Sequence, residues 1–93
     1  MPAPYDEVKP ADFTRLQADE IGAEVAAEWL ADATPPEIRK YLAVERPVIP
    51  VHIDARLIRR AYRELGYETR LPEWVKAVLR SGFLCEVRRV MAT

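Results

Sequence analysis

The sequence predicts a mainly helical protein, a compact bundle of about four helices in one small domain. Apolar residues recur at helical spacing in four separate stretches of the chain. Residues that favour helix starts and helix ends stand between these stretches. The chain has 93 residues, of which 49% are hydrophobic and 31% charged, so it is large enough for one core and too short for two domains.

The first part of the chain divides into an arm and a helix. Residues 1–11 carry three of the eight prolines, so we expect an extended N-terminal arm. Residues 12–33 are expected to form a helix, because most of their apolar residues fall on one side at about 100° per residue. Phe13 and Leu16 lie off this apolar side. They predict either a bend near Asp19 or a separate first turn.

The segment Thr34-Pro35-Pro36-Glu37 predicts the start of a second helix. Thr34 can cap the helix, proline suits the first turn, and Glu37 completes a capping box. We expect this helix to end before Pro47. Residues 47–53 are predicted to be non-helical, as a buried extended connector or a short edge strand, because Pro47 and Pro50 restrict the backbone.

Two further helices are predicted from their caps. Asp54 is expected to cap the third helix, and Gly66 to end it in the left-handed conformation. Pro72 is expected to open the fourth helix, and Gly82 to end it.

The C-terminal tail, residues 83–93, fits two structures. Phe83, Cys85 and Val87 alternate as in a strand, but the apolar residues of the tail also suit a helix. If the tail is a strand, residues 84–90 pair with residues 48–53 in a short two-stranded ribbon beside the helices.

Charge divides the chain into two parts of opposite sign. Residues 1–37 hold nine acidic and two basic side chains, a net charge of −7, whereas residues 38–93 hold six acidic and twelve basic ones, a net charge of +6. Such an asymmetry suggests a role in partner binding. The acidic residues with helical spacing are Glu20, Glu24 and Glu28, and the basic ones are Arg56, Arg59, Arg60 and Arg63, which Arg39 and Lys40 could extend.

Three interpretations of these two charged faces remain open. The arginine face is solvated or offset by the glutamate face within the fold, where exposed pairs contribute about 0–1 kcal/mol each. Alternatively, either face docks a protein partner or a second copy of the chain. In the third interpretation, the arginine face binds the phosphates of a nucleic acid.

Residues suited to catalysis are scarce. His52, Cys85 and Ser81 are each the only residue of their kind, and Cys85 stands in an apolar run, where a thiol is usually inert. One histidine and one cysteine do not make a zinc site, and the glycines are too scattered for a phosphate-binding loop. We therefore expect no enzyme, cofactor, metal site or small-molecule substrate.

Residues 16–22 and 34–42 together resemble the helix-turn-helix of winged-helix repressors, in which a supporting helix precedes a basic recognition helix. The resemblance implies a DNA-binding regulator with Arg39 and Lys40 at its interface. The stretch between the two parts is longer than the turn of that motif and lacks its usual glycine. With no asparagine and one glutamine, base recognition would depend mainly on arginine.

The expected function is that of a small non-enzymatic binding protein, an adaptor, regulator or inhibitor that docks a macromolecule. A protein partner is favoured and self-association is an option. An inhibitor of a host machine, encoded by a phage or mobile element, is one such role. The alternative is a nucleic-acid-binding transcriptional regulator with a helix-turn-helix-like element. A single cysteine, no secretory signal and no apolar run of about 20 residues predict a cytoplasmic protein without membrane contact.

Overall fold

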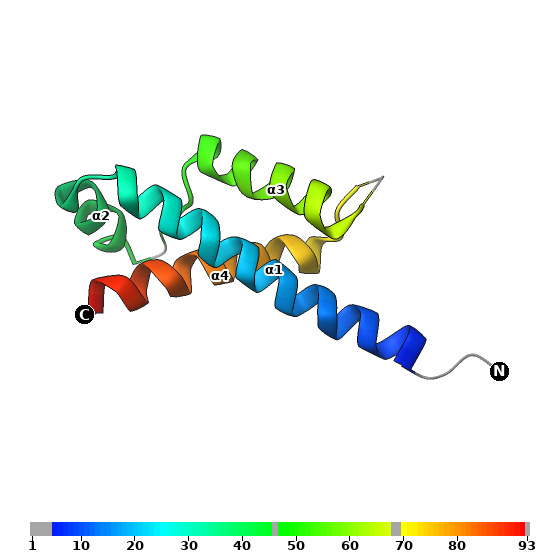
Figure 1. Ribbon diagram of the computed structural model, residues 1–93. Coiled ribbons are helices and arrows are strands. Elements are labelled where there is room, and N and C mark those ends of the chain that lie inside the picture. The colour runs from blue at the N-terminus through cyan, green and yellow to red at the C-terminus, as the bar shows by residue number, and fades with distance from the viewer. Residues whose placement is uncertain (1–4, 46, 68–69, 93) are drawn as a thin grey trace.

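A computed structural model describes residues 5–45, 47–67 and 70–92, and the side chains from residue 13 onward. It confirms the predicted helical bundle (Figure 1). No strand occurs in the described residues. The four helices are α1 (Tyr5–Asp32), α2 (Pro35–Leu42), α3 (Val51–Leu65) and α4 (Glu73–Ala92).

Helix α1 is longer than the sequence predicts. It begins at Tyr5, so the predicted arm is helical from that residue on, and residues 1–4 lie outside the described part. Once a helix has nucleated, each added residue costs little, which favours extension of a well-packed helix into its flanks. The helix is continuous, without a separate first turn, and leaves Phe13 and Leu16 exposed. Its N-terminal end projects beyond the other helices (Figure 1).

Helices α1 and α4 approach each other closely at two glycines. A Cβ atom on Gly22 would lie 2.3 Å from the carbonyl oxygen of Leu79, and one on Gly82 would lie 2.6 Å from the carbonyl oxygen of Asp19. Both separations are shorter than any normal carbon–oxygen contact, so only glycine fits. The prediction that Gly82 ends the fourth helix is therefore wrong, because this glycine serves the helix crossing and α4 continues to Ala92.

The core lies between α1, α3 and α4 and includes an aromatic cluster at the α2 end. Phe83 of α4 is fully buried, with ring centroids 5.7 Å from Trp29 and 6.4 Å from Tyr41. Trp29 of α1 and Tyr41 of α2 are themselves 5.3 Å apart in an edge-to-face arrangement. The other large side chains with almost no exposure are Leu57, Leu71, Leu79, Val25, Val75 and Val87.

The C-terminal tail is helical, so the ribbon between residues 48–53 and 84–90 does not form. A strand would place Phe83, Cys85 and Val87 on one face, but Cys85 is exposed while Phe83 and Val87, one helical turn apart, are buried. The packing of this turn against the bundle decides between the two structures that the sequence allows.

Two predicted helix caps are confirmed. The amide of Glu37 donates to Thr34 Oγ1 at 3.4 Å, and the amide of Thr34 donates to Glu37 Oε2 at 3.2 Å, which completes the capping box. Gly66 ends α3 with φ 74°. Helix α4 starts directly after Pro72, whose carbonyl accepts the first helical hydrogen bonds.

The third helix starts earlier than predicted. Its first residue is Val51, and the carbonyl of Pro50 accepts hydrogen bonds from the amides of Ile53 and Asp54. Proline suits this position because it precedes the helix and blocks no internal bond. Asp54 is therefore not the cap, and only residues 47–50 of the predicted connector are non-helical.

Candidate interaction surfaces

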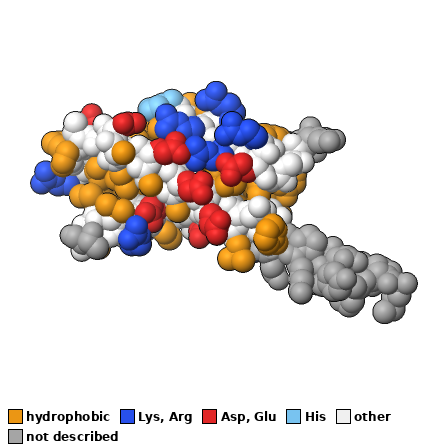
Figure 2. Space-filling model, viewed as in Figure 1, with side chains coloured by type: hydrophobic (Ala, Val, Ile, Leu, Met, Phe, Trp, Pro, Cys, Tyr) orange, Lys and Arg blue, Asp and Glu red, His pale blue; other side chains and the backbone are white. Residues whose placement is uncertain are grey.

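The predicted basic stripe follows the outer side of α3. Figure 2 shows blue side chains gathered over α3, with red carboxylates directly below them over α1. The four arginines surround one shallow hollow of about 350 Å³, which they line together with a carboxylate of α1. The lining residues are Glu28, Arg56, Arg59, Arg60 and Arg63.

Two arginines of this stripe are paired with carboxylates within the fold. Arg60 Nη2 donates to Glu28 Oε2 at 2.6 Å, while its Nη1 lies 3.6 Å from Glu24 Oε2 and its Nε lies 3.5 Å from Glu64 Oε2. Arg56 Nη1 lies 3.9 Å from Glu28 Oε1. The side chain of Arg60 is only 18% exposed. These pairs form a charged ladder that joins the rim of α3 to α1.

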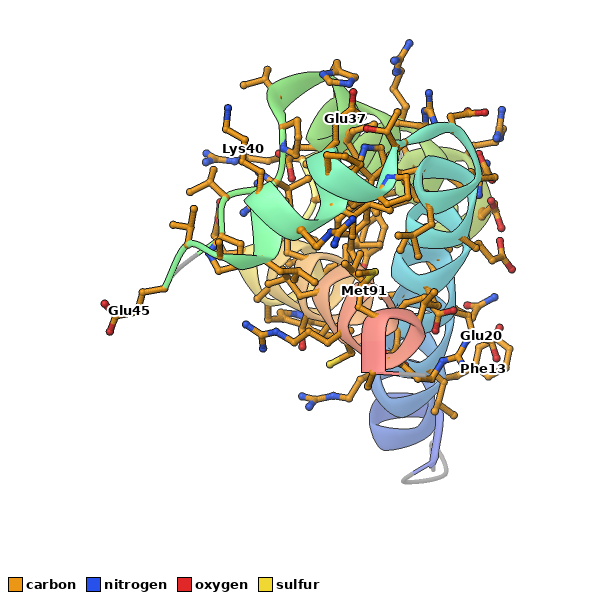
Figure 3. The ribbon with its side chains drawn as sticks, turned by 90° about the vertical axis from the view of Figure 1, so that its left-hand side faces the viewer. Phe13, Glu20, Glu37, Lys40, Glu45 and Met91 are labelled. Atoms are coloured by element: carbon orange, nitrogen blue, oxygen red, sulfur yellow. The ribbon has the colours of Figure 1, made fainter. Side chains whose placement is uncertain are left out.

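The other two arginines have no carboxylate partner in the described part of the chain. Arg59 and Arg63 are exposed, and the one polar contact of Arg59 is a long hydrogen bond of 3.5 Å to the carbonyl of Ala55. Glu20, the third member of the acidic stripe, is also exposed and points away from the bundle (Figure 3). These three side chains can meet a partner without breaking an internal pair.

Arg39 and Lys40 do not extend the stripe, because they lie on α2 and are not among the residues around the arginine hollow. Figure 3 shows Lys40 far from Glu20 of α1. A separate hollow of about 520 Å³ includes Lys40. Residues 16–22 of the helix-turn-helix resemblance form the middle of the 28-residue α1, not a short supporting helix.

A second, apolar surface surrounds the connector between α2 and α3. Val48 and Val51 are 82% and 86% exposed, whereas Ile49 between them is buried and anchors the connector. They border a hollow of about 480 Å³, which we call the connector hollow. Its lining residues are Pro47, Val48, Ile49, Val51, Asp54, Arg80 and Leu84.

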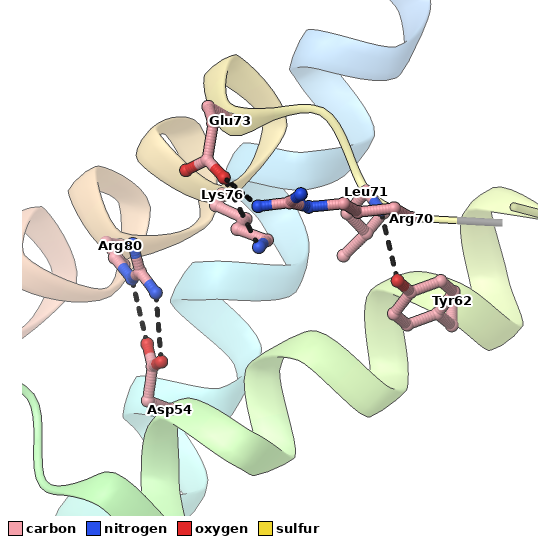
Figure 4. A network of polar contacts seen from close by, with 7 residues as sticks. All are labelled: Asp54, Tyr62, Arg70, Leu71, Glu73, Lys76 and Arg80. Atoms are coloured by element: carbon pink, nitrogen blue, oxygen red, sulfur yellow. Dashed lines mark hydrogen bonds and ion pairs between the residues drawn. The ribbon is translucent and has the colours of Figure 1, made fainter.

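A bidentate ion pair lines one edge of the connector hollow. Arg80 of α4 donates to Asp54 of α3 through Nε at 2.9 Å and Nη2 at 3.0 Å (Figure 4). The hydrogen bond to Asp54 raises the pKa of the Arg80 guanidinium. Nearby, the amide of Leu71 donates to the Tyr62 hydroxyl at 3.1 Å. The ion pair joins α3 to α4 and leaves the edge of the hollow with balanced charge, while the Tyr62 hydroxyl holds the segment before α4 against α3.

The single histidine and the single cysteine lie on different helices. His52 is exposed in the first turn of α3, and Cys85 is exposed on α4. A ribbon of residues 48–53 with 84–90 would have placed His52 and Cys85 on paired strands, but both segments that carry these residues are helical. Nowhere in the described ranges do three histidine, cysteine or acidic side chains gather as metal ligands. None of the described helices combines the length and apolarity needed to cross a membrane.

Comparison with known proteins finds no relative. The chain matches no family model, and searches of curated proteins and of solved structures found no match to it. Inferences about function therefore rest on the two surfaces described above.

Proposed function

We propose that this protein is a non-enzymatic protein-binding module, of the adaptor, regulator or inhibitor kind. Its partner docks on the face formed by α1 and α3, which we call the mixed-charge face. This face consists of Glu20, Glu24, Glu28, Arg56, Arg59, Arg60 and Arg63. The observation that carries the proposal is that the arginines of the stripe differ in whether a carboxylate of the fold pairs with them. Arg60 is surrounded by three carboxylates, whereas Arg59 and Arg63 are exposed without any in the described chain. Their guanidinium groups keep their forked donor geometry for the carboxylates of a partner.

The carboxylates of α1 favour a protein over a nucleic acid. Duplex DNA is a nearly continuous line of phosphates, about one charge per 1.7 Å, and calls for an uninterrupted basic track. On this face the red stripe of α1 runs beside the blue stripe of α3 (Figure 2). A polypeptide can place an acidic residue over Arg59 and Arg63 and a basic residue over Glu20. Complementary charges of this kind set specificity and orientation.

The proposal is tested by selecting random short peptides, displayed on phage, against the immobilised protein. Binding of the selected peptides is then measured by fluorescence anisotropy on the wild type and on the variant Arg59→Gln/Arg63→Gln. The matched control, Arg39→Gln/Arg70→Gln, removes the same charge from exposed arginines outside the face. We expect peptides that combine acidic and basic residues, and affinity about tenfold or more weaker in the first variant only, a change of about 1.4 kcal/mol.

Two results would overturn the proposal. One is a selection that yields no peptides, or peptides that bind the Arg59→Gln/Arg63→Gln variant as well as the wild type. The other is tighter binding of labelled DNA or RNA than of any peptide, with a steep loss of affinity between about 50 and 200 mM salt. That result would establish phosphate binding and favour a nucleic-acid-binding regulator.

A further inference from the structure

The mixed-charge face consists of two stripes of opposite sign that run side by side, the basic one on α3 and the acidic one on α1 (Figure 2). Pairing within the fold leaves charge over in both stripes. On α3, Arg59 and Arg63 are exposed without a carboxylate partner in the described chain. On α1, Glu20 is exposed with no cation paired to it there, and Glu24 is 59% exposed and lies 3.6 Å from Arg60. Each stripe therefore keeps two side chains that another molecule can reach.

These remaining charges lie at matching levels along the two helices. Helices α1 and α3 run in opposite directions (Figure 1). Arg60 lies 2.6 Å from Glu28 and 3.6 Å from Glu24, so it is level with the turn of α1 between those two glutamates. A helix rises about 5.4 Å per turn, so Arg63, about one turn further along α3, is level with the turn between Glu24 and Glu20.

A face with this pattern is complementary to itself. Consider a two-fold axis that lies in the plane of contact, parallel to the stripes and midway between them. Rotation about this axis places the acidic stripe of one copy over the basic stripe of the other and keeps every residue at its level. Arg63 of one copy then meets Glu20 and Glu24 of the other. Arg59, the neighbour of Arg60, meets Glu24, and the same contacts recur by symmetry.

This self-complementarity selects a second copy over an unrelated protein. An unrelated partner would need two stripes of opposite sign in the same order, with the same separation and the same levels. A second copy carries such stripes by construction. Complementary charges of this kind fix the orientation of two molecules. The formal net charge of the chain is −1, so long-range repulsion between copies is small.

We infer that the mixed-charge face binds a second copy of the chain, in a two-fold symmetric dimer in which the arginines of α3 meet the glutamates of α1. The inference rests on the proposed function, because it names the occupant of the same face. Exposed ion pairs are individually weak, so we expect a reversible dimer with a dissociation constant below about 1 mM. Raising salt from about 0.1 to 1 M shortens the screening length from about 10 to 3 Å and should weaken this dimer about tenfold or more.

The test is sedimentation equilibrium of the full chain at concentrations up to about 1 mM, with two charge-reversed variants. Arg59→Glu/Arg63→Glu replaces the available cations of α3, and Glu20→Arg/Glu24→Arg replaces the available carboxylates of α1. Each variant alone should self-associate about tenfold or more weakly than the wild type, because like charges face each other across the axis. An equimolar mixture of the two should dimerise about as tightly as the wild type, because each reversed stripe then faces the opposite charge.

The matched control is Arg39→Glu/Lys40→Glu, which makes the same change of charge on exposed residues of α2, outside the face. It should dimerise like the wild type. Circular dichroism confirms that each variant is folded.

The outcomes separate this inference from the proposed function. A wild type that stays monomeric up to about 1 mM while the selected peptides still bind would overturn the inference and leave the proposed function standing. A monomeric wild type that also selects no peptides would remove both. A dimer that persists undiminished in about 1 M salt or in both reversed variants, or a mixture that does not restore dimerisation, would also overturn the inference.

Discussion

Helix α1 meets its two neighbours in different ways. On the α4 side, Gly22 and Gly82 bring the two backbones together, and no further atom fits between them. On the α3 side, long charged side chains such as Arg60 and Glu28 meet at a solvated rim. The first contact requires particular residues, while the second can tolerate substitution because exposed ion pairs contribute little. The comparison teaches that packing, at the glycine crossing and in the core shared with α3, holds the fold, whereas the charged rim is not required for it.

The largest effect is expected at the glycine crossing. Gly22→Ala should lower the free energy of unfolding by about 3 kcal/mol, because the new methyl group meets backbone atoms that cannot move independently. The direction of the change in unfolding free energy is informative, because a glycine-to-alanine substitution in an open helix interior has the opposite effect and stabilises by up to about 1 kcal/mol. Urea unfolding measures the difference. A variant as stable as the wild type would show that the two helices do not touch here.

A smaller loss is expected from the ion pair between α3 and α4. Arg80→Ala removes both hydrogen bonds to the half-buried Asp54 and should cost about 1 kcal/mol, allowing for partial exposure. A double-mutant cycle with Asp54→Ala isolates the pair from other effects. Additive effects of the two substitutions would contradict the bidentate contact.

One substitution in the aromatic cluster, where α2 packs against α1 and α4, should increase stability. The hydroxyl of Tyr41 is buried without a hydrogen-bond partner in the described residues, so Tyr41→Phe should stabilise the fold by about 1 kcal/mol. Burial raises the pKa of this hydroxyl above its usual value of about 10, although the charge of Arg88 opposes the shift. Below pH 10 the hydroxyl is neutral in both states. As pH rises above that value, the unfolded chain loses the proton first, so stability falls.

The predicted loss of stability at alkaline pH is checked by thermal unfolding of the wild type and of Tyr41→Phe at pH values on either side of about 10. The wild type should lose more stability than the variant on the alkaline side. Equal losses in the two proteins would show that the hydroxyl is as solvated in the folded chain as in the unfolded one.

The smallest effect is expected on the charged rim. Arg60→Gln breaks the contacts to Glu24, Glu28 and Glu64, yet should change the unfolding free energy by about 1 kcal/mol or less, because those carboxylates remain solvated. Urea unfolding in low and high salt tests this, since screening should reduce the difference further. A loss as large as that of Gly22→Ala would remove the contrast between the two sides of α1.

Local sequence signals predicted the parts of the structure that neighbouring residues decide. The capping box of Thr34 and Glu37 depends on residues three positions apart, and the left-handed Gly66 depends on its own backbone. The grouping of Arg56, Arg59, Arg60 and Arg63 follows from the helical repeat.

Contacts between distant parts of the chain left no such local signal. Gly82 looks like a helix end until Asp19 and Gly22 are placed against it. Asp54 looks like a cap, and its partner Arg80 is 26 residues away. Likewise, the unequal pairing of the arginines depends on which of them face α1, which is a property of the packed bundle.

The proposal that packing holds the fold while the charged rim of α1 and α3 binds a partner is tested most directly with Arg59→Gln/Arg63→Gln. Urea unfolding and peptide binding are measured on the same preparation. We predict an unfolding free energy within about 0.5 kcal/mol of the wild type together with peptide binding about tenfold or more weaker. A loss of about 2 kcal/mol or more in stability, or unchanged peptide binding, would contradict it.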